Sequence, residues 1–243
     1  MVGTQVQVFA ETDSTNDLAR RAGETGAAEG LVFFAEAQRA GRGRRGRTWS
    51  SLPGSGLLFS VLLRPAVRRN CWPRLTLVAV RATIEALSGF GVAANWKWPN
   101  DVVIGSQKIA GILVEATSSF LVLGVGMNVR QRAADFPAVL HGRAISVEMI
   151  TGRGIDRVAL AAAILARLDL HYRSNWEGMS FSDTLQFCVD RAAVQSSRDV
   201  RVNAGGTWTS GTLLGYTADG YLRLGLDGCE HIIVDGLLEE SPA

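Results

Sequence analysis

One stretch of the sequence limits the folds that are open to this chain: residues 39–49 read Arg-Ala-Gly-Arg-Gly-Arg-Arg-Gly-Arg-Thr-Trp. The stretch places five arginines among three glycines, shortly after the apolar run 31–35 that is typical of a buried strand. Glycine lets a backbone approach a ligand closely, and arginine presents a planar fork to phosphate or carboxylate groups. The stretch therefore predicts a cationic loop that binds an anion.

Three phosphate-binding loops share this glycine spacing, and the flanking residues exclude each of them. A dinucleotide-binding loop opens a helix and is followed by an acid about 20 residues on, whereas Pro53, Gly54 and Gly56 prevent a long helix and Arg64 stands where the acid would be. A P-loop needs a lysine where this chain has Arg47. A protein-kinase loop needs His-Arg-Asp and Asp-Phe-Gly partners, and neither tripeptide occurs. A flexible loop between two strands remains.

Taken alone, this loop is as compatible with a solvated basic segment or a small nucleic-acid-binding patch as with a specific anion site. The formal net charge is +2, and five of the 25 basic residues lie in the loop, so the rest of the surface is close to neutral. A general nucleic-acid binder is therefore disfavoured. An RNA-binding module would also need interleaved aromatic side chains for base stacking, and only Trp49 lies near the arginines.

Cysteine and histidine usage predicts an intracellular protein without a zinc site. The three cysteines are scattered and have no C-x-x-C spacing, and the three histidines are equally dispersed. Residues 1–9 contain no basic segment followed by an apolar core, and no window approaches 18 apolar residues. We expect a cytoplasmic protein that does not insert into a membrane.

Lysine is rare enough in this chain to attract attention. There are 23 arginines and only two lysines, Lys97 and Lys108. A lysine ammonium is a compact, strongly hydrated point charge, so it suits sites where the planar fork of arginine does not fit. Lys97 and Lys108 are therefore both candidate functional cations, and chance placement on a solvated hairpin stays open as the alternative for one of the two.

The pattern of apolar runs predicts one main domain with a small appendage. A chain of 243 residues with 47% hydrophobic residues can bury a substantial core. Asp-Gly pairs at 219–220 and 227–228 separate short alternating strands near the C-terminus, which is typical of hairpins. We expect a main domain over residues 1–195 and a small β-barrel over 196–243, with four short strands at 200–203, 207–216, 221–226 and 231–234. The strands are expected at 6–9, 31–38, 56–63, 95–98, 102–104, 108–115 and 120–129, and the helices at 18–22, 74–87 and 156–176.

A polar run precedes the first predicted helix. Ser14 and Asp17 have the spacing of a capping box, in which two side chains satisfy backbone N–H groups at the start of a helix. The run of polar side chains from Thr12 to Thr15 exceeds what one cap uses. Some of them are therefore expected to face a polar ligand.

Taken in order, five motifs make the chain resemble the biotin–protein ligase family. The resemblance implies an α+β fold, with a mixed sheet flanked by helices that is related to the class II aminoacyl-tRNA synthetase core, followed by an SH3-like barrel. Some members carry an N-terminal helix-turn-helix domain and act as repressors; only a few residues precede the first motif here, so we expect a monofunctional type that does not bind DNA. The motifs are Ser14-Thr15-Asn16, residues 38–46, residues 97–101, residues 108–115 and residues 124–129.

The resemblance also implies a reaction and its partners. Members of the family activate biotin with ATP and Mg²⁺ to biotinyl-5′-AMP, release pyrophosphate, and transfer biotin to one lysine of a biotin carboxyl carrier protein or domain. Such carriers belong to acetyl-CoA, propionyl-CoA or pyruvate carboxylase. Monomeric and homodimeric assembly are both open. Because the acyl-adenylate hydrolyses readily, the loop is expected to close over it.

The site residues follow from the same resemblance. The implied catalytic residues are Lys108, Arg42, Arg44 and Asp101. Biotin is implied to contact Ser14, Thr15, Asn16, Gln38, Gly41, Arg42, Gly43, Arg44, Lys108 and Gly111. The nucleotide is implied to contact Arg42, Arg44, Arg45, Trp49, Asn100, Lys108 and Asn128. Asn100 and Asp101 are the candidates for contact with Mg²⁺.

Two other functions compete with this interpretation. A lipoate–protein ligase shares the fold and the adenylation chemistry, but that family usually lacks the arginine-rich loop and the Trp-Pro-Asn-Asp turn. A non-catalytic sensor of biotin or nucleotide would bind the same ligands without turnover. The presence of Lys108 and the absence of a DNA-binding segment in this sequence argue against a sensor.

Overall fold

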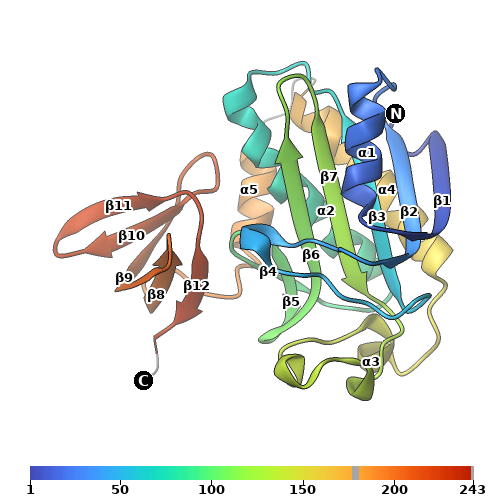
Figure 1. Cartoon of the computed structure of the whole chain (residues 1–243). Helices are drawn as coiled ribbons and strands as arrows, with labels where there is room; N and C mark the ends of the chain where they lie inside the picture. Colours follow the sequence, from blue (N-terminus) through green and yellow to red (C-terminus); the bar gives the residue numbers. More distant parts are fainter. Residues whose placement is uncertain (177–180, 242–243) are drawn as a thin grey trace.

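Two β-sheets organise the computed structural model, which describes residues 1–176 and 181–241 (Figure 1). The larger sheet has seven strands in the order β1-β2-β3-β7-β6-β5-β4. The smaller one has five strands in the order β11-β10-β9-β8-β12 and is called the C-terminal sheet below. The strands of the larger sheet are β1 Gln5–Thr12, β2 Leu31–Gln38, β3 Gly56–Leu63, β4 Asn95–Lys97, β5 Asp101–Ile104, β6 Gln107–Ala116 and β7 Leu121–Asn128.

The larger sheet is mixed, as predicted. β1 runs parallel to β2, and every other neighbouring pair is antiparallel. The uninterrupted apolar run of β3 predicts a strand covered on both faces, and all eight of its residues are buried. β3 pairs along its whole length with β7, so these two strands form the centre of the sheet.

Helices cover the two faces of the larger sheet unequally. α2 (Leu75–Gly89) packs against α4 (Arg157–Trp176), α5 (Phe181–Val189) and the sheet, and this face contains the main hydrophobic core. α1 (Thr15–Glu24) lies on the opposite face over β2, β3 and β7 (Figure 1). Its small core consists of Ala19, Leu31, Phe33, Leu62, Phe120 and Val122. The remaining helical segments are α3 Val147–Thr151 and the 3₁₀ turns η1 Arg44–Gly46, η2 Arg69–Arg74, η3 Ala133–Asp135 and η4 Ala138–Leu140.

The expected capping box at the start of α1 is wrong. Ser14 occupies the N-cap position, but its side chain makes no capping hydrogen bond. The carboxylate of Asp17 points to Arg42 instead of turning back to the backbone of Ser14. An arginine fork offers a carboxylate two charge-assisted hydrogen bonds, which outweigh one bond to a backbone amide.

The C-terminal sheet contains the four predicted strands and one more. Its strands are β8 Asp199–Ala204, β9 Thr207–Tyr216, β10 Leu222–Leu226, β11 Cys229–Ile233 and β12 Leu237–Glu240. All neighbouring pairs are antiparallel, which agrees with a barrel-like unit. The unpredicted β12 pairs with β8, and its short sequence gives little alternation from which to predict a strand.

An aromatic contact and a hydrogen bond join the C-terminal sheet to the β4 side of the larger sheet. The rings of Trp96 and Tyr216 have centroids 4.8 Å apart. Trp98 donates its indole N–H to the carbonyl oxygen of Gly220 at 3.2 Å. Within the described ranges, no helix is both long and apolar enough to cross a membrane.

Candidate functional site

The start of α1 forms a buried polar cluster on the sheet. Ser14, Thr15 and Asn16 are 3–4% exposed. The side-chain oxygen of Gln38 accepts hydrogen bonds from the backbone N–H of Thr15 at 2.7 Å and from its hydroxyl at 3.1 Å. From the floor of the sheet, the Ser60 hydroxyl contacts the Thr15 hydroxyl at 2.7 Å and Asn16 Oδ1 at 2.5 Å. Hydroxyl and amide groups held in this way can donate to and accept from a neutral polar ligand.

Arg42 and two carboxylates connect this cluster to the glycine-arginine loop. The loop is defined here as residues 41–49. Arg42 forms a two-pronged bond to Asp17, with distances of 2.9 and 2.7 Å, and lies 3.4 Å from Glu115 Oε2. Glu115 also accepts a hydrogen bond from Asn16 at 2.8 Å. The hydrogen bond from Arg42 lowers the pKa of Asp17, and the same bond raises the pKa of Arg42, so both groups remain charged.

The next two arginines of the loop turn toward the C-terminal sheet. Arg44 lies 2.5 Å from Asp235 Oδ1, and Arg45 lies 3.4 Å from Asp235 Oδ2. Arg45 also donates to the carbonyl oxygen of Asn203 at 2.8 Å. Its backbone has φ of 57°, a left-handed conformation that costs an L-residue about 1–2 kcal/mol. The contacts with the C-terminal sheet offset that cost.

Trp49, at the end of the loop, covers two glycines of the sheet. A side-chain carbon at Gly126 would lie 2.6 Å from the Trp49 ring, and one at Gly111 would lie 3.3 Å from it. Gly111 and Gly126 are paired across β6 and β7, so the indole rests on a flat part of the sheet without side chains. The Trp49 indole N–H is buried and has no hydrogen-bond partner among the described residues. Such a donor is available to an acceptor on a bound ligand.

Lys108 lies beside Trp49 and faces a carboxylate. Its Nζ atom is 2.6 Å from Asp101 Oδ1 and 5.3 Å from the centre of the Trp49 ring. The side chains of Lys108 and Asp101 are 33% and 24% exposed, so solvent and a ligand can both reach them. A compact ammonium over an indole is also favoured by the ring quadrupole.

Asn100, the residue before Asp101, is bonded to the backbone of β6. Its side-chain amide donates to the backbone carbonyl oxygen of Ile112 at 2.6 Å, and its backbone carbonyl oxygen accepts from the Ile112 N–H at 3.0 Å. Within the described part of the chain, no group of three or more His, Cys, Asp or Glu side chains is arranged to hold a metal ion.

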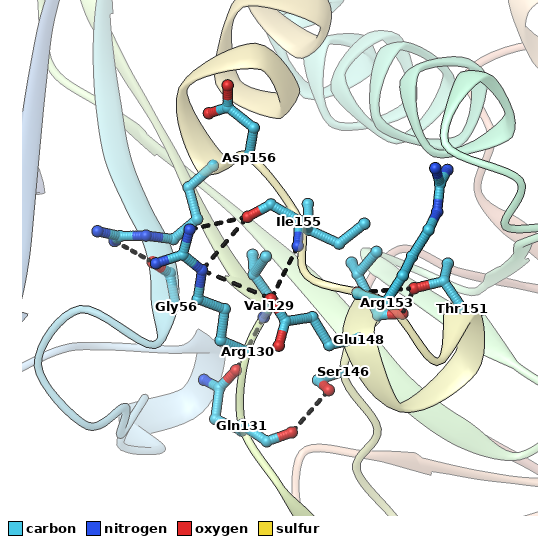
Figure 2. Close-up of polar contacts among 12 residues, drawn as sticks. Gly56, Val129, Arg130, Gln131, Ser146, Glu148, Thr151, Arg153, Ile155 and Asp156 are labelled. Atoms are coloured by element: carbon cyan, nitrogen blue, oxygen red, sulfur yellow. Dashed lines mark hydrogen bonds and ion pairs between the residues drawn. The ribbon is translucent and has the colours of Figure 1, made fainter.

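Asn128, at the end of β7, is fixed by the chain around it. Its amide donates to the carbonyl oxygens of Ile145 at 3.2 Å and Lys108 at 3.4 Å. The segment that leaves β7 is held by the network in Figure 2, in which Gln131 accepts from the Val129 N–H at 2.8 Å. The two bonds from Asn128 use its N–H₂ group and hold it beside the backbone of Lys108.

A groove runs along the outer edge of β6 between the loop and the C-terminal sheet. Its volume is about 850 Å³. Its lining includes loop residues 42–46, residues 112–116 of β6, and residues 219–221 and 234–235 of the C-terminal region. β5 pairs only with residues 107–111 of β6, so the groove follows the part of β6 that β5 leaves uncovered.

Most of the predicted site residues therefore meet on one face of the sheet. The exceptions are Arg44 and Arg45, which face Asp235, and Asn100, which faces Ile112. Sequence reasoning assigned no function to Asp17, Ser60, Glu115 or Asp235. Ser60 carries a signal, because a hydroxyl inside an apolar strand needs a partner. Asp235 carries none, because it is distant in sequence from the loop.

Comparisons with known proteins identify the family to which the chain belongs. Residues 8–131 match the model of the biotin/lipoate A/B protein ligase family. The biotin–[acetyl-CoA-carboxylase] ligase of Mycobacterium tuberculosis is 36% identical over 171 residues, which are 68% of this chain and 63% of that protein. The bifunctional ligase/repressor BirA of Bacillus subtilis is 36% identical over 166 residues, and the match spans only 51% of its length and 66% of this chain.

Solved structures extend the likeness to the whole fold. The biotin protein ligase from Aquifex aeolicus in complex with biotin and ATP superposes with a TM-score of 0.86 at 29% identity. The match covers 98% of this chain and 100% of that one, so the C-terminal sheet is included. With its sequence motifs, its site geometry and these comparisons in agreement, the chain belongs to the biotin/lipoate A/B protein ligase family.

Proposed function

We propose that this protein is a biotin–protein ligase, which activates biotin with ATP and transfers it to a lysine of a biotin carboxyl carrier protein or domain. One observation carries the proposal. The buried polar cluster at the start of α1, the cationic loop and Lys108 lie together on a single sheet face. A ligand with a neutral polar head and an anionic tail fits this order of groups.

The polar cluster suits the ureido ring of biotin. That ring offers two N–H donors and one carbonyl acceptor, so its pocket must contain both acceptors and donors. Ser14, Thr15 and Gln38 supply hydroxyl and amide groups that the fold already orients. We assign Asn16, Gly41, Gly43 and Gly111 to the walls of the same pocket.

In the first step, a carboxylate oxygen of biotin attacks the α-phosphorus of ATP. The bond between the α-phosphorus and the bridging oxygen breaks, and pyrophosphate leaves with that electron pair. Negative charge accumulates between the two reactants, so fixed cations stabilise the transition state. Lys108, Arg42 and Arg44 supply this charge in the proposal, with Arg45 at the outer phosphates.

We propose that the nucleotide binds beside Trp49, whose ring rests directly on the sheet. The indole covers a flat part of the sheet and brings an unpartnered N–H there, which suits contact with a planar base and an acceptor atom. Asn128 lies at the same end of the sheet and is assigned to the adenine. The Mg²⁺ ion enters as MgATP, and Asn100 and Asp101 provide the nearby oxygen atoms.

In the second step, the amine of the carrier's lysine attacks the acyl carbon of biotinyl-AMP. An amide bond forms, the mixed anhydride breaks, and AMP leaves with the electron pair. The amine must first lose a proton, because the pKa of a free lysine is about 10.4. Asp101 orients the amine in this proposal, since its carboxylate lies 2.6 Å from the cation of Lys108.

The remaining assignments rest on the family and on the sequence. Residues 1–195 are proposed as the catalytic domain and 196–243 as an SH3-like barrel. The carrier is proposed to belong to acetyl-CoA, propionyl-CoA or pyruvate carboxylase; the name of the M. tuberculosis relative supports the first. We place the protein in the cytoplasm, where ATP is available and free cysteines persist.

Pyrophosphate release tests the proposal. The protein is mixed with MgATP and biotin, with lipoate in a parallel reaction, and the bound product is identified by mass spectrometry. Biotin-dependent release with retained biotinyl-AMP is expected, followed by transfer to an added carrier domain. Release with lipoate alone would identify a lipoate ligase. Binding of biotin without release would identify a sensor.

A further inference from the structure

Asp235, in the bend between β11 and β12, contacts the glycine-arginine loop at two successive arginines. It lies 2.5 Å from Arg44 and 3.4 Å from Arg45. The side chains of Arg44 and Arg45 are 28% and 26% exposed and that of Asp235 is 42% exposed, so the two contacts are shielded from solvent mainly on the arginine side. A shielded ion pair is weakened less by salt than a fully exposed one.

The position of Asp235 is itself fixed by packing. The neighbouring residue Gly236 is buried, and a side-chain carbon there would lie 3.2 Å from the Trp98 ring and 3.0 Å from Val202. Asn203, whose carbonyl oxygen binds Arg45, belongs to β8, the strand that pairs with β12. The carboxylate therefore approaches the loop from a rigid part of the C-terminal sheet.

The loop is anchored at three places, each by a different part of the chain. Arg42 is held by Asp17 of α1 and Glu115 of β6. Trp49 packs on β7. The middle of the loop, where Arg45 has a positive φ, is held by Asp235 and Asn203. Without Asp235, the middle of the loop would lose its charged contact while both ends stayed attached.

We propose that Asp235 is a positioning residue that keeps the middle of the glycine-arginine loop closed over the acyl-adenylate until the carrier's lysine arrives. This inference rests on the proposed ligase function. In this proposal the C-terminal sheet helps to retain the intermediate and does not contact the reacting atoms. Removing the carboxylate should therefore accelerate loss of the intermediate more than it slows its formation.

The test compares three variants with the unaltered protein. Asp235→Asn removes the charge and keeps the shape, and Asp235→Glu restores the charge. Asp219→Asn is the matched control, because Asp219 also joins the C-terminal sheet to the rest of the chain, through Arg74 at 2.7 Å, but has no contact with the loop. The first-turnover rate of pyrophosphate release measures formation of biotinyl-AMP. Gel filtration followed by timed mass spectrometry measures its loss from the protein.

We expect Asp235→Asn to form the intermediate within about twofold of the normal rate and to lose it about fivefold faster, as two partly exposed ion pairs predict. Asp235→Glu should recover most of this retention, and Asp219→Asn should behave normally. Normal retention in Asp235→Asn would overturn the inference. Equal acceleration in Asp235→Asn and Asp219→Asn would also overturn it, because docking of the sheet would then be the cause.

Hydrogen exchange separates failure of this inference from failure of the proposed function. If the unaltered protein releases no pyrophosphate with biotin, the ligase function fails, and the contact is still testable in the ligand-free protein. Asp235→Asn should then increase exchange across 41–49 and leave β8 to β12 unchanged. Unchanged exchange in the loop would refute the positioning role.

Discussion

Replacement of Gly126 by alanine tests whether Trp49 must rest directly on β7. The added carbon would lie 2.6, 2.8 and 2.9 Å from three atoms of the indole. Carbon atoms normally stay about 3.5–4.0 Å apart, so the ring has to retreat by roughly 1 Å. Displacement of an active-site group by that distance can reduce the rate about 100-fold. We expect biotin-dependent pyrophosphate release to fall about 10- to 100-fold.

The fold should tolerate this change, because Trp49 lies in a loop and can move without opening the main core. We expect the free energy of unfolding to fall by about 1 kcal/mol or less, at the low end for overpacking. Gly89→Ala is the matched control, since a side-chain carbon there meets no atom within 4 Å. Initial rates of pyrophosphate release and denaturant unfolding curves measure the two effects separately.

A double-mutant cycle identifies the cause. In a Trp49→Ala background, the alanine at 126 no longer has a ring to displace, so it should have little further effect. Additive losses in the double variant would show that Gly126 matters for another reason. An unaltered rate in the single variant would refute the requirement for direct contact.

Three further changes probe other parts of the molecule. Lys108→Arg keeps the charge but should lower adenylation at least about tenfold, because the fork does not fit a point-charge site; near-normal pyrophosphate release would contradict this. Asp101→Asn should impair transfer to the carrier about tenfold more than adenylation, and equal losses in single-turnover assays of the two steps would exclude the assigned role. Burial raises the pKa of Glu85, but hydrogen bonds from His171 and Arg81 outweigh it and lower the pKa from 4.5 to about 2. Because the folded pKa is the lower one, this group stabilises the fold above pH 4.5 and loses that contribution as the pH falls toward 2, on the order of 2 kcal/mol. Thermal melts of Glu85→Gln should therefore depend less on pH in this window than those of the unaltered protein, and parallel pH profiles would refute the assignment.

The strands of the larger sheet could be predicted from the sequence because their apolar runs are long. Residues 56–63 and 121–128 contain almost no polar side chains, which suits central strands buried on both faces. Their pairing could not be predicted, because β3 and β7 are separated by two helices and three strands along the chain. Periodicity reports local structure and carries no information about a distant partner.

The site residues also fall into two groups: those that the sequence indicates and those that only the structure shows. The resemblance of the sequence motifs to those of the family indicates Arg42, Arg44 and Lys108 without a structure. Their carboxylate partners require one, because Asp17 is also a plausible helix cap and Asp235 lies 191 positions after Arg44 in an unremarkable turn. Charge complementarity across such a distance has no local signature in a single sequence.

The unequal covering of the larger sheet implies an uneven distribution of stability. Two long helices and the main core hold one face, whereas α1 is held by six small-core residues and the polar cluster at its start. Native proteins open first where few apolar contacts resist opening. Of the long helices on the two faces of the larger sheet, α1 is therefore the one whose local unfolding should require the least free energy. A ligand that contacts both Thr15 and the sheet would bind only the form in which α1 is folded. Binding would therefore stabilise α1 against local opening.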